Sequence, residues 1–332
     1  MSVTETSRLL TPEEIAVRAG QQVPFLRLPE RAGVFAERET RLRERSASHP
    51  MRDFLLFMAE VARAQHETLQ SYGPVALPAA AAVDVASRAG TAPLAATQWP
   101  RDPAWREHLR ALLGRLEPRV KGSPAQAAVA NVRSLADDAL EQQADRLLNG
   151  VMLGLDLAAA PLIAAGLQTY WTHLVLQTEN TRSADRLAPF GRTDDPSGCP
   201  CCASRPTASI SRIGADMSGY RYLHCSLCST QWHMVRIKCS HCLGTKGIEF
   251  RSLLAAGDAA AADNASTADT IQAETCDTCH HYLKIVRMER DLNVEPVADD
   301  LASLTLDLLV SDAGYERHGV NLMLLFGDPG GS

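Results

Sequence analysis

Residues 199–242 read CPCCASRPTASISRIGADMSGYRYLHCSLCSTQWHMVRIKCSHC, and they decide the fold because they contain three Cys-x-x-Cys pairs. A fourth pair, CDTC, follows at 276–279. Two residues between cysteines allow a tight turn to point both sulfurs at one metal ion, while N–H groups of the turn donate to the thiolates. Eight such cysteines suffice for two tetrahedral sites; they are Cys199, Cys202, Cys225, Cys228, Cys239, Cys242, Cys276 and Cys279.

The spacing allows two ways of combining the pairs. Consecutive pairing joins the first two pairs in one site and the last two in another, whereas cross-bracing joins the first with the third and the second with the fourth. We favour consecutive pairing, because the strand, turn and strand predicted between residues 203 and 224 form the insertion that a ribbon needs. Tetrahedral sulfur ligation suits iron and zinc alike. Zinc would make the sites structural, and iron would add one-electron redox chemistry.

All nine cysteines of the 332-residue chain lie between 199 and 279. In a reducing compartment, clustered pairs of this kind are metal ligands rather than disulfides. The opening residues, MSVTETSRLLTPEEIAV, have neither the basic nor the apolar region of an export signal, so we expect a cytoplasmic protein. The apolar stretch 151–167 contains Asp156 and Pro161, which favours a buried loop and helix over stable membrane insertion.

The first 190 residues are predicted to be helical. Apolar residues recur every three or four positions over 54–69, FLLFMAEVARAQHETL, and a second amphipathic stretch opens at Arg101-Asp102-Pro103. Gly150 is expected to end a further helix as its C-cap. Residues 161–178, PLIAAGLQTYWTHLVLQT, are predicted to form the last long helix of this half.

The helical pattern breaks at 188–198, APFGRTDDPSG, where we place a domain boundary. Shorter apolar segments follow, and they predict strands at Ile210–Ile213, Tyr220–His224, Thr230–Lys238 and Tyr282–Arg287. After Pro296 the pattern predicts a single helix, with Asp299-Asp300 on a solvated face near its N-terminus. The prediction is an α+β multidomain protein: a helical domain over 1–190, a β-rich module with two rubredoxin-like or zinc-ribbon-like four-cysteine sites over 191–295, and a C-terminal helix and tail over 296–332.

Four segments carry a family resemblance: CPCCASRP (199–206), RYLHCSLCSTQWHMVRIKCSHC (221–242), AETCDTCHHYLKIV (273–286) and VADDLAS (297–303). Together they strongly resemble the formate dehydrogenase accessory protein (FdhE) family. The resemblance is tight from Cys199 to Ser303 and weaker in the helical half.

The resemblance implies a cytoplasmic, rubredoxin-like, iron-binding protein with an N-terminal helical domain. Its role would be to help mature respiratory formate dehydrogenase by binding the molybdenum-containing catalytic subunit. The eight paired cysteines would hold two metal ions, iron first and zinc as the alternative. The sequence contains no catalytic constellation and no phosphate-binding Gly-rich loop, so we expect a protein that is not an enzyme, with no catalytic residue, no small-molecule substrate and no nucleic-acid partner.

The chain departs from the family pattern after its cysteine pairs. The family usually has glycine after the first pair, where this chain has Ala203, and the other pairs are followed by Ser229, Leu243 and His280. Glycine relieves a left-handed backbone at such turns, so we expect strain at these positions. Cys201 is an extra thiol, which we interpret as a small residue that fills the turn.

Two other functions compete with an assembly role. A zinc-ribbon nucleic-acid binder is disfavoured by the net charge of -6 and by the balance over 196–290, where ten Lys and Arg face eight Asp and Glu without a basic stripe. A thiol oxidoreductase would use Cys199-Pro200-Cys201-Cys202, but a thioredoxin motif opens a helix, and here a strand pattern follows. Five histidines near the pairs are predicted to donate hydrogen bonds to the metal ligands or to lie at the surface rather than to ligate metal; they are His224, His233, His241, His280 and His281.

Overall fold

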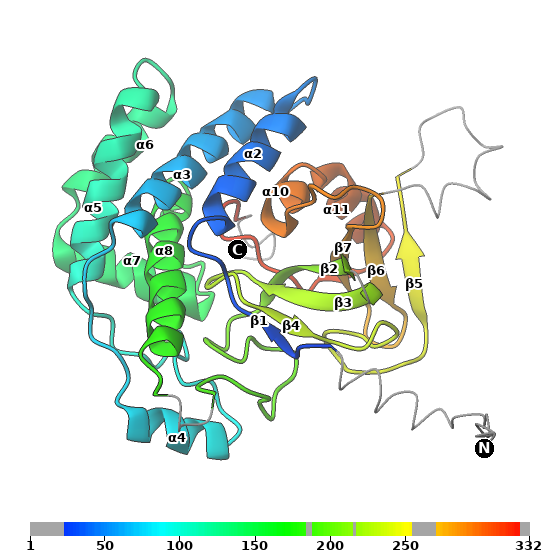
Figure 1. Cartoon of the computed structure of the whole chain (residues 1–332). Coiled ribbons are helices and arrows are strands. Elements are labelled where there is room, and N and C mark those ends of the chain that lie inside the picture. Colours follow the sequence, from blue (N-terminus) through cyan, green and yellow to red (C-terminus); the bar gives the residue numbers. More distant parts are fainter. Residues whose placement is uncertain (1–22, 184–187, 215–216, 254–269, 326–332) are drawn as a thin grey trace, which may run out of the picture.

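A group of helices and a mixed β-sheet make up the two halves of the protein (Figure 1). The computed structural model describes residues 23–183, 188–214, 217–253 and 270–325. The helices predicted over 54–69 and 161–178 are confirmed, and Gly150 ends a helix in the left-handed conformation, with φ of 68°. The helices of the first half are α2 (Val34–Ser46), α3 (Arg52–Gln70), α4 (Ala80–Arg88), α5 (Ala104–Leu116), α6 (Ala125–Ser134), α7 (Asp137–Asn149) and α8 (Ala160–Asn180).

Helix α8 forms the centre of the helical half, because nearly every side chain from Ala160 to Val175 is buried. Helices α3, α5 and α7 pack around it. Gly166 permits the close approach of α5, since a Cβ atom there would lie 2.9 Å from the Leu109 side chain. In the described parts of the chain, no helix combines the length and the apolar character that a membrane span requires. The apolar surface of α8 is covered by protein.

The sheet has the strand order β1-β4-β3-β2-β7-β6-β5, and β8 pairs with β7. Two antiparallel pairs, β2–β3 and β6–β7, are joined where β2 and β7 run parallel, with Ser209 opposite Ile285. The strands are β1 (Leu26–Arg27), β2 (Pro206–Gly214), β3 (Met217–Cys225), β4 (Gln231–His233), β5 (Ile248–Arg251), β6 (Ile271–Cys276), β7 (His281–Arg287) and β8 (Glu316–Arg317). The predicted α+β fold class is confirmed, although β1 and β8 come from outside the predicted module.

One predicted strand is too long. Strand β4 ends at His233, whereas Thr230–Lys238 was expected to be a single strand. The chain leaves the sheet after Met234, and the side chains of Val235 and Ile237 are both 62% exposed. This departure carries Cys239 away from β3 and β4 toward the β6–β7 hairpin, where the fourth cysteine pair lies.

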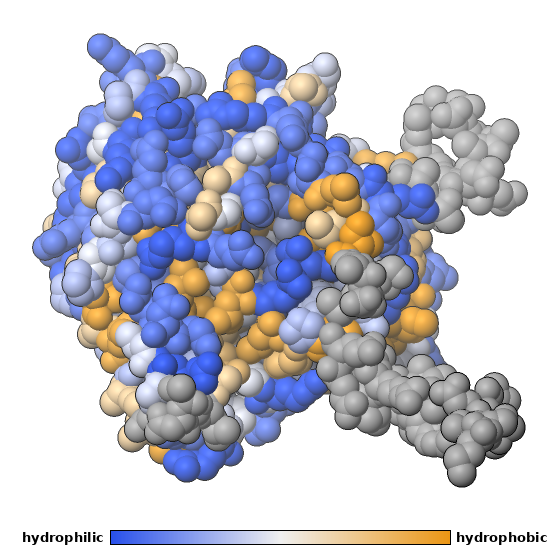
Figure 2. All heavy atoms as spheres, viewed as in Figure 1, coloured by the Kyte–Doolittle hydropathy of each residue, from blue (hydrophilic) through white to orange (hydrophobic). Residues whose placement is uncertain are grey.

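The predicted single C-terminal helix is two helices, α10 (Pro296–Leu301) and α11 (Leu304–Asp312), followed by β8. The Ser303 hydroxyl donates to the carbonyl oxygens of Asp299 and Asp300. It therefore competes with the backbone N–H groups that would continue the helix at this point. Figure 2 shows mainly hydrophilic side chains over α2 and α5 and a hydrophobic area in the region of α11. Leu308 and Leu309 of α11 are 66% and 54% exposed.

Asp299 and Asp300 are fully buried, so the prediction that they form a solvated face is wrong. Helix α10 lies between α2 and the strands β2 and β7. Asp299 accepts from Arg41 Nε at 2.9 Å and from Arg45 Nε at 2.6 Å, both on α2. Next to it, Arg38 Nε lies 3.1 Å from Glu295 Oε1. These pairs attach α2 to α10 and to its N-cap residue, Glu295.

Asp300 faces the opposite way and joins α10 to the sheet. Lys284 Nζ of β7 lies 2.9 Å from Asp300 Oδ1, and Arg317 Nη2 of β8 lies 2.7 Å from the same oxygen. Burial alone would raise the pKa of Asp300, but Arg317 and Lys284 outweigh it and lower the pKa below its ordinary value. The carboxylate is therefore ionised in the folded protein and supports folding at neutral pH.

Replacing Asp299 by alanine should destabilise the protein strongly, because two guanidinium groups would lose a fully buried counter-ion. Removing one partner of a buried ion pair costs about 3–5 kcal/mol. Urea denaturation followed by circular dichroism measures the loss. The matched control is Asp53→Ala, whose carboxylate is 99% exposed and 3.7 Å from Arg52; it should change the free energy of unfolding by less than about 0.5 kcal/mol. Equal effects of the two substitutions would contradict the prediction.

Candidate metal centres

The four Cys-x-x-Cys turns share one backbone conformation. The residue after each pair has a positive φ: 59° at Ala203, 59° at Ser229, 62° at Leu243 and 54° at His280. These are four of the five non-glycine residues with positive φ in the described chain. A left-handed residue costs an L-amino acid about 1–2 kcal/mol. The expected strain is confirmed, and its repetition shows that each turn needs this conformation to bring its two sulfurs together.

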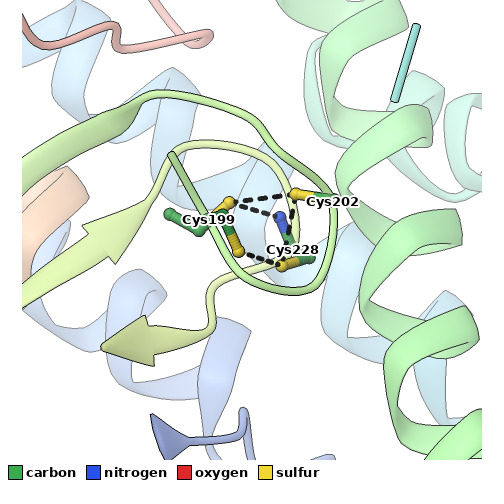
Figure 3. A group of neighbouring side chains, drawn as sticks. Cys199, Cys202 and Cys228 are labelled. Carbon is green, nitrogen blue, oxygen red and sulfur yellow. Dashed lines mark hydrogen bonds between the residues drawn. The ribbon is translucent and has the colours of Figure 1, made fainter. Parts of the chain in front are cut away.

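The first cluster consists of Cys199, Cys202, Cys225 and Cys228. Figure 3 shows three of them, Cys199, Cys202 and Cys228, with their sulfurs directed toward one another. The Sγ–Sγ distances are 3.6 Å for Cys199–Cys228, 3.4 Å for Cys202–Cys225 and 3.6 Å for Cys202–Cys228. Metal–sulfur bonds of about 2.3 Å in a tetrahedron place neighbouring sulfurs about 3.8 Å apart. The four thiols therefore fit a single tetrahedral ion.

The second cluster consists of Cys239, Cys242, Cys276 and Cys279. Here the Sγ–Sγ distances are 3.7 Å for Cys239–Cys279 and 3.8 Å for Cys242–Cys276, which fit the same tetrahedron. The preferred consecutive pairing is confirmed, because each cluster combines two neighbouring pairs along the chain. Cross-bracing is excluded, since the sulfurs of the first pair converge with those of the second pair, and the sulfurs of the third pair converge with those of the fourth.

Backbone N–H groups point at the sulfurs in both clusters. Leu227 N and Cys228 N each lie 3.4 Å from Cys225 Sγ. In the second cluster, His241 N lies 3.4 Å and Cys242 N 3.5 Å from Cys239 Sγ. Such donors stabilise a thiolate, the form in which cysteine binds a metal ion.

The pKa of Cys276 shows the effect of such donors. Burial raises the pKa of this thiol, but backbone N–H groups of Cys279 and Thr278, together with the neighbouring thiols, lower it to about 7. A substantial fraction of Cys276 is therefore thiolate at neutral pH.

The two clusters differ in burial. All four cysteines of the first cluster are at most 1% exposed and belong to the main hydrophobic core. Helix α8 contacts the first cluster through Gln168, whose Nε2 donates to the Ser226 carbonyl oxygen at 2.8 Å. In the second cluster, Cys242 is exposed and Cys279 is partly exposed. The first cluster is a part of the core, and the second lies at the surface.

Cys201 stays outside both clusters and is fully buried. Its Sγ lies 3.5 Å from Thr230 Oγ1, and its carbonyl oxygen accepts from Leu94 N at 3.0 Å. Burial raises the pKa of the Cys201 thiol. A substrate disulfide has no access to this sulfur, and the run opens a turn and then β2 rather than a helix. These observations argue against a thiol oxidoreductase at Cys199-Pro200-Cys201-Cys202.

The five histidines near the pairs occupy different environments. His224 is buried, its Nδ1 is 3.3 Å from Gln231 Nε2, and burial lowers its pKa to about 3. His280 lies beside the Tyr315 ring, and His233 beside Tyr220 and Tyr222. His241 and His281 stack on each other next to Cys279. Nothing in the sequence indicates that these two rings stack, although both lie within two residues of a cysteine of the second cluster.

Comparison with known proteins agrees with this geometry. Three FdhE family models match the chain: the N-terminal model over residues 23–187, the central model over 198–236 and the C-terminal model over 237–324. The chain belongs to the FdhE family. The FdhE homolog of Klebsiella pneumoniae is 35% identical over 311 residues, and the FdhE of Escherichia coli K12 is 36% identical over 311 residues; each alignment covers 94% of both chains.

A solved FdhE structure shares the fold. The crystal structure of the FdhE protein from Pseudomonas aeruginosa superposes with a TM-score of 0.78 at 33% identity, covering 92% of this chain and 100% of that chain. The FdhE central model contains the first two cysteine pairs, and the C-terminal model contains the last two. The division into the two models therefore coincides with the division into the two clusters.

Substitution in the first cluster should remove one metal ion. Cys225→Ser leaves three sulfurs, so the metal content of the purified protein should fall from two ions to about one per chain, measured by mass spectrometry of the metal. The control is Cys201→Ala, which removes a buried sulfur outside both clusters and should retain two ions. Loss of an ion from the Cys201 variant would contradict this assignment.

Replacing Ala203 by glycine should stabilise the protein by up to about 1 kcal/mol, because it removes the cost of a left-handed alanine. Thermal unfolding measures the effect. The matched control is Ala130→Gly, at an exposed position inside α6, which should destabilise by about 1 kcal/mol. The same sign for both substitutions would show that the φ of Ala203 is not the determining factor.

Proposed function

We propose that this chain is a cytoplasmic accessory factor that binds the catalytic subunit of respiratory formate dehydrogenase and assists its maturation. In this proposal it carries two metal ions and catalyses no reaction. The observation that carries the proposal is the match to the FdhE models over residues 23–187 and 198–324, combined with two clusters of four converging sulfurs. The eight residues proposed as ligands are Cys199, Cys202, Cys225, Cys228, Cys239, Cys242, Cys276 and Cys279.

Iron is the proposed metal in both sites, with zinc as the alternative. The donor set supports either ion, since both accept four thiolates in a tetrahedron. Iron would supply a one-electron couple, whereas zinc would act only as a cross-link. The protein's contribution is the same for both ions: the turns hold the sulfurs at bonding geometry and their N–H groups stabilise the thiolate charge.

The distribution of charge supports a protein partner over a nucleic acid. Two of the ten basic residues between 196 and 290 are buried in ion pairs: Arg221 lies 2.7 Å from Glu274, and Lys284 lies 2.6 Å from Asp307. These cations cannot contact phosphate groups. The remaining basic side chains are balanced by the acidic ones, so the module lacks the excess positive charge that phosphate binding needs.

Anaerobic purification followed by metal analysis and absorption spectroscopy tests the metal. We expect about two ions per chain and, for iron, ferric thiolate charge-transfer bands in the visible region after oxidation. A colourless protein that contains two zinc ions would show that zinc is the metal, and it would rule out a redox role for the two sites. A protein that purifies folded with no metal would overturn the metal-carrying part of the proposal.

Co-purification with the tagged catalytic subunit from the same cells tests the partner. We expect binding by the wild-type chain and by the Cys201→Ala variant. A deletion of the gene should abolish formate-dependent dye reduction, and the same two forms should restore it. Normal formate dehydrogenase activity in the deletion strain, or failure of the subunit to bind, would overturn the proposed role.

A further inference from the structure

We propose that the second cluster exchanges its metal ion with solution through His241 and His281, while the first cluster retains its ion. This inference rests on the proposed function, because it assumes that both clusters hold metal. Its first basis is the difference in burial. Cys242 is exposed and Cys279 is partly exposed, whereas the first cluster is enclosed by the main core. An ion can leave the second cluster without any opening of the core.

The second basis is the hydrogen bonding of His281. Its Nδ1 lies 2.7 Å from the Cys279 carbonyl oxygen. A carbonyl oxygen can only accept, so Nδ1 carries the proton and the neutral ring has its lone pair on Nε2. Metal-ligating histidines typically donate their other ring N–H to a carbonyl or carboxylate in this manner. In this tautomer His281 Nε2 has the lone pair that metal coordination requires, although His281 belongs to neither four-sulfur cluster.

The third basis is the position of the two rings. His241 lies inside the third cysteine pair, and His281 opens β7 two residues after Cys279 of the fourth pair. Their ring centroids are 3.7 Å apart, and one ring nitrogen of each lies with Cys279 Sγ in a group whose atoms are all within 4.8 Å of one another. Glu316 Oε2 lies 3.5 Å from His281 Nε2, and the Glu316 side chain is 83% exposed. His241 is exposed as well, so the two histidines lie between the second cluster and solvent.

The proposed exchange replaces one ligand at a time. With an ion bound, the exposed Cys242 would be the sulfur that can give up the ion and take up a proton from the solution, and a ring nitrogen of His241 or His281 would be available beside Cys279 to take its place. The ion keeps its oxidation state throughout. Because a nitrogen donor substitutes for the departing thiolate, the ion reaches solvent without passing through a state that has lost several ligands at once.

The first cluster lacks such an exit. Within the described residues, no histidine joins its four sulfurs in a common group. The nearest histidine in sequence, His224, is buried and engages Gln231. Helix α8 and the segment containing Leu94 and Ala96 hold its turns by backbone and side-chain hydrogen bonds. Release of this ion requires the core to open.

Chelator competition tests the inference. The full chain is loaded with two zinc ions under reducing conditions and mixed with excess 4-(2-pyridylazo)resorcinol, whose absorbance reports zinc release. We expect two phases of equal amplitude. His241→Asn with His281→Asn should slow the fast phase about tenfold, of the order of the effects that ligand-shell substitutions produce, and should leave the slow phase unchanged. His280→Asn is the matched control, because His280 lies beside Tyr315 and asparagine tolerates its φ of 54°.

The two proposals fail differently in this experiment. Binding of fewer than two zinc ions would overturn the proposed metal-carrying function. Two bound ions released with a single rate constant would overturn the difference between the clusters. Cys279→Ser should abolish the fast phase and Cys225→Ser the slow phase; the reverse assignment would also overturn the inference. If the double variant with His241→Asn and His281→Asn released zinc at an unchanged or faster rate, these two rings would have no part in the exchange.

Discussion

Four cysteine sulfurs converge inside the hydrophobic core at the place where the helices meet the sheet. The first cluster packs in the same core as α3, α5 and α8, so the turns that carry its sulfurs cannot move independently of the helices. Buried thiols without a metal ion would pack as small apolar groups, whereas thiolates there require a cation that offsets their charge. An ion at this point would cross-link two chain segments within the core and would couple metal binding to folding.

A second set of contacts fixes the ends of the chain to this core. The buried carboxylates of Asp299 and Asp300 face in opposite directions, one toward the arginines of α2 and the other toward Lys284 and Arg317 of the sheet. Each carboxylate is surrounded by cations, so neither remains an uncompensated buried charge. The short helix α10 thus joins the first described helix, the sheet and the last strand.

The two clusters are alike in chemistry and different in environment. Both have the same turn conformation and similar sulfur spacing, because both use the same Cys-x-x-Cys geometry. Access to solvent separates them: one ion would be enclosed, and the other would lie beside two histidines at the surface. A protein with this arrangement can keep one site as a permanent part of its fold while the other remains available to its surroundings.

The sequence by itself determined the helical half, the four Cys-x-x-Cys pairs and the family, since these depend on local patterns: three- and four-residue apolar spacing, and two-residue gaps between cysteines. It also located the strain at Ala203, Ser229, Leu243 and His280, because the turn requires a left-handed residue wherever it occurs. The tertiary structure alone decided the burial of Asp299 and Asp300, whose cations come from residues about 250 positions earlier and from a later strand. It likewise decided the stacking of His241 on His281 and the difference in exposure between the clusters, because contacts between segments distant in sequence leave no periodic signal in either one.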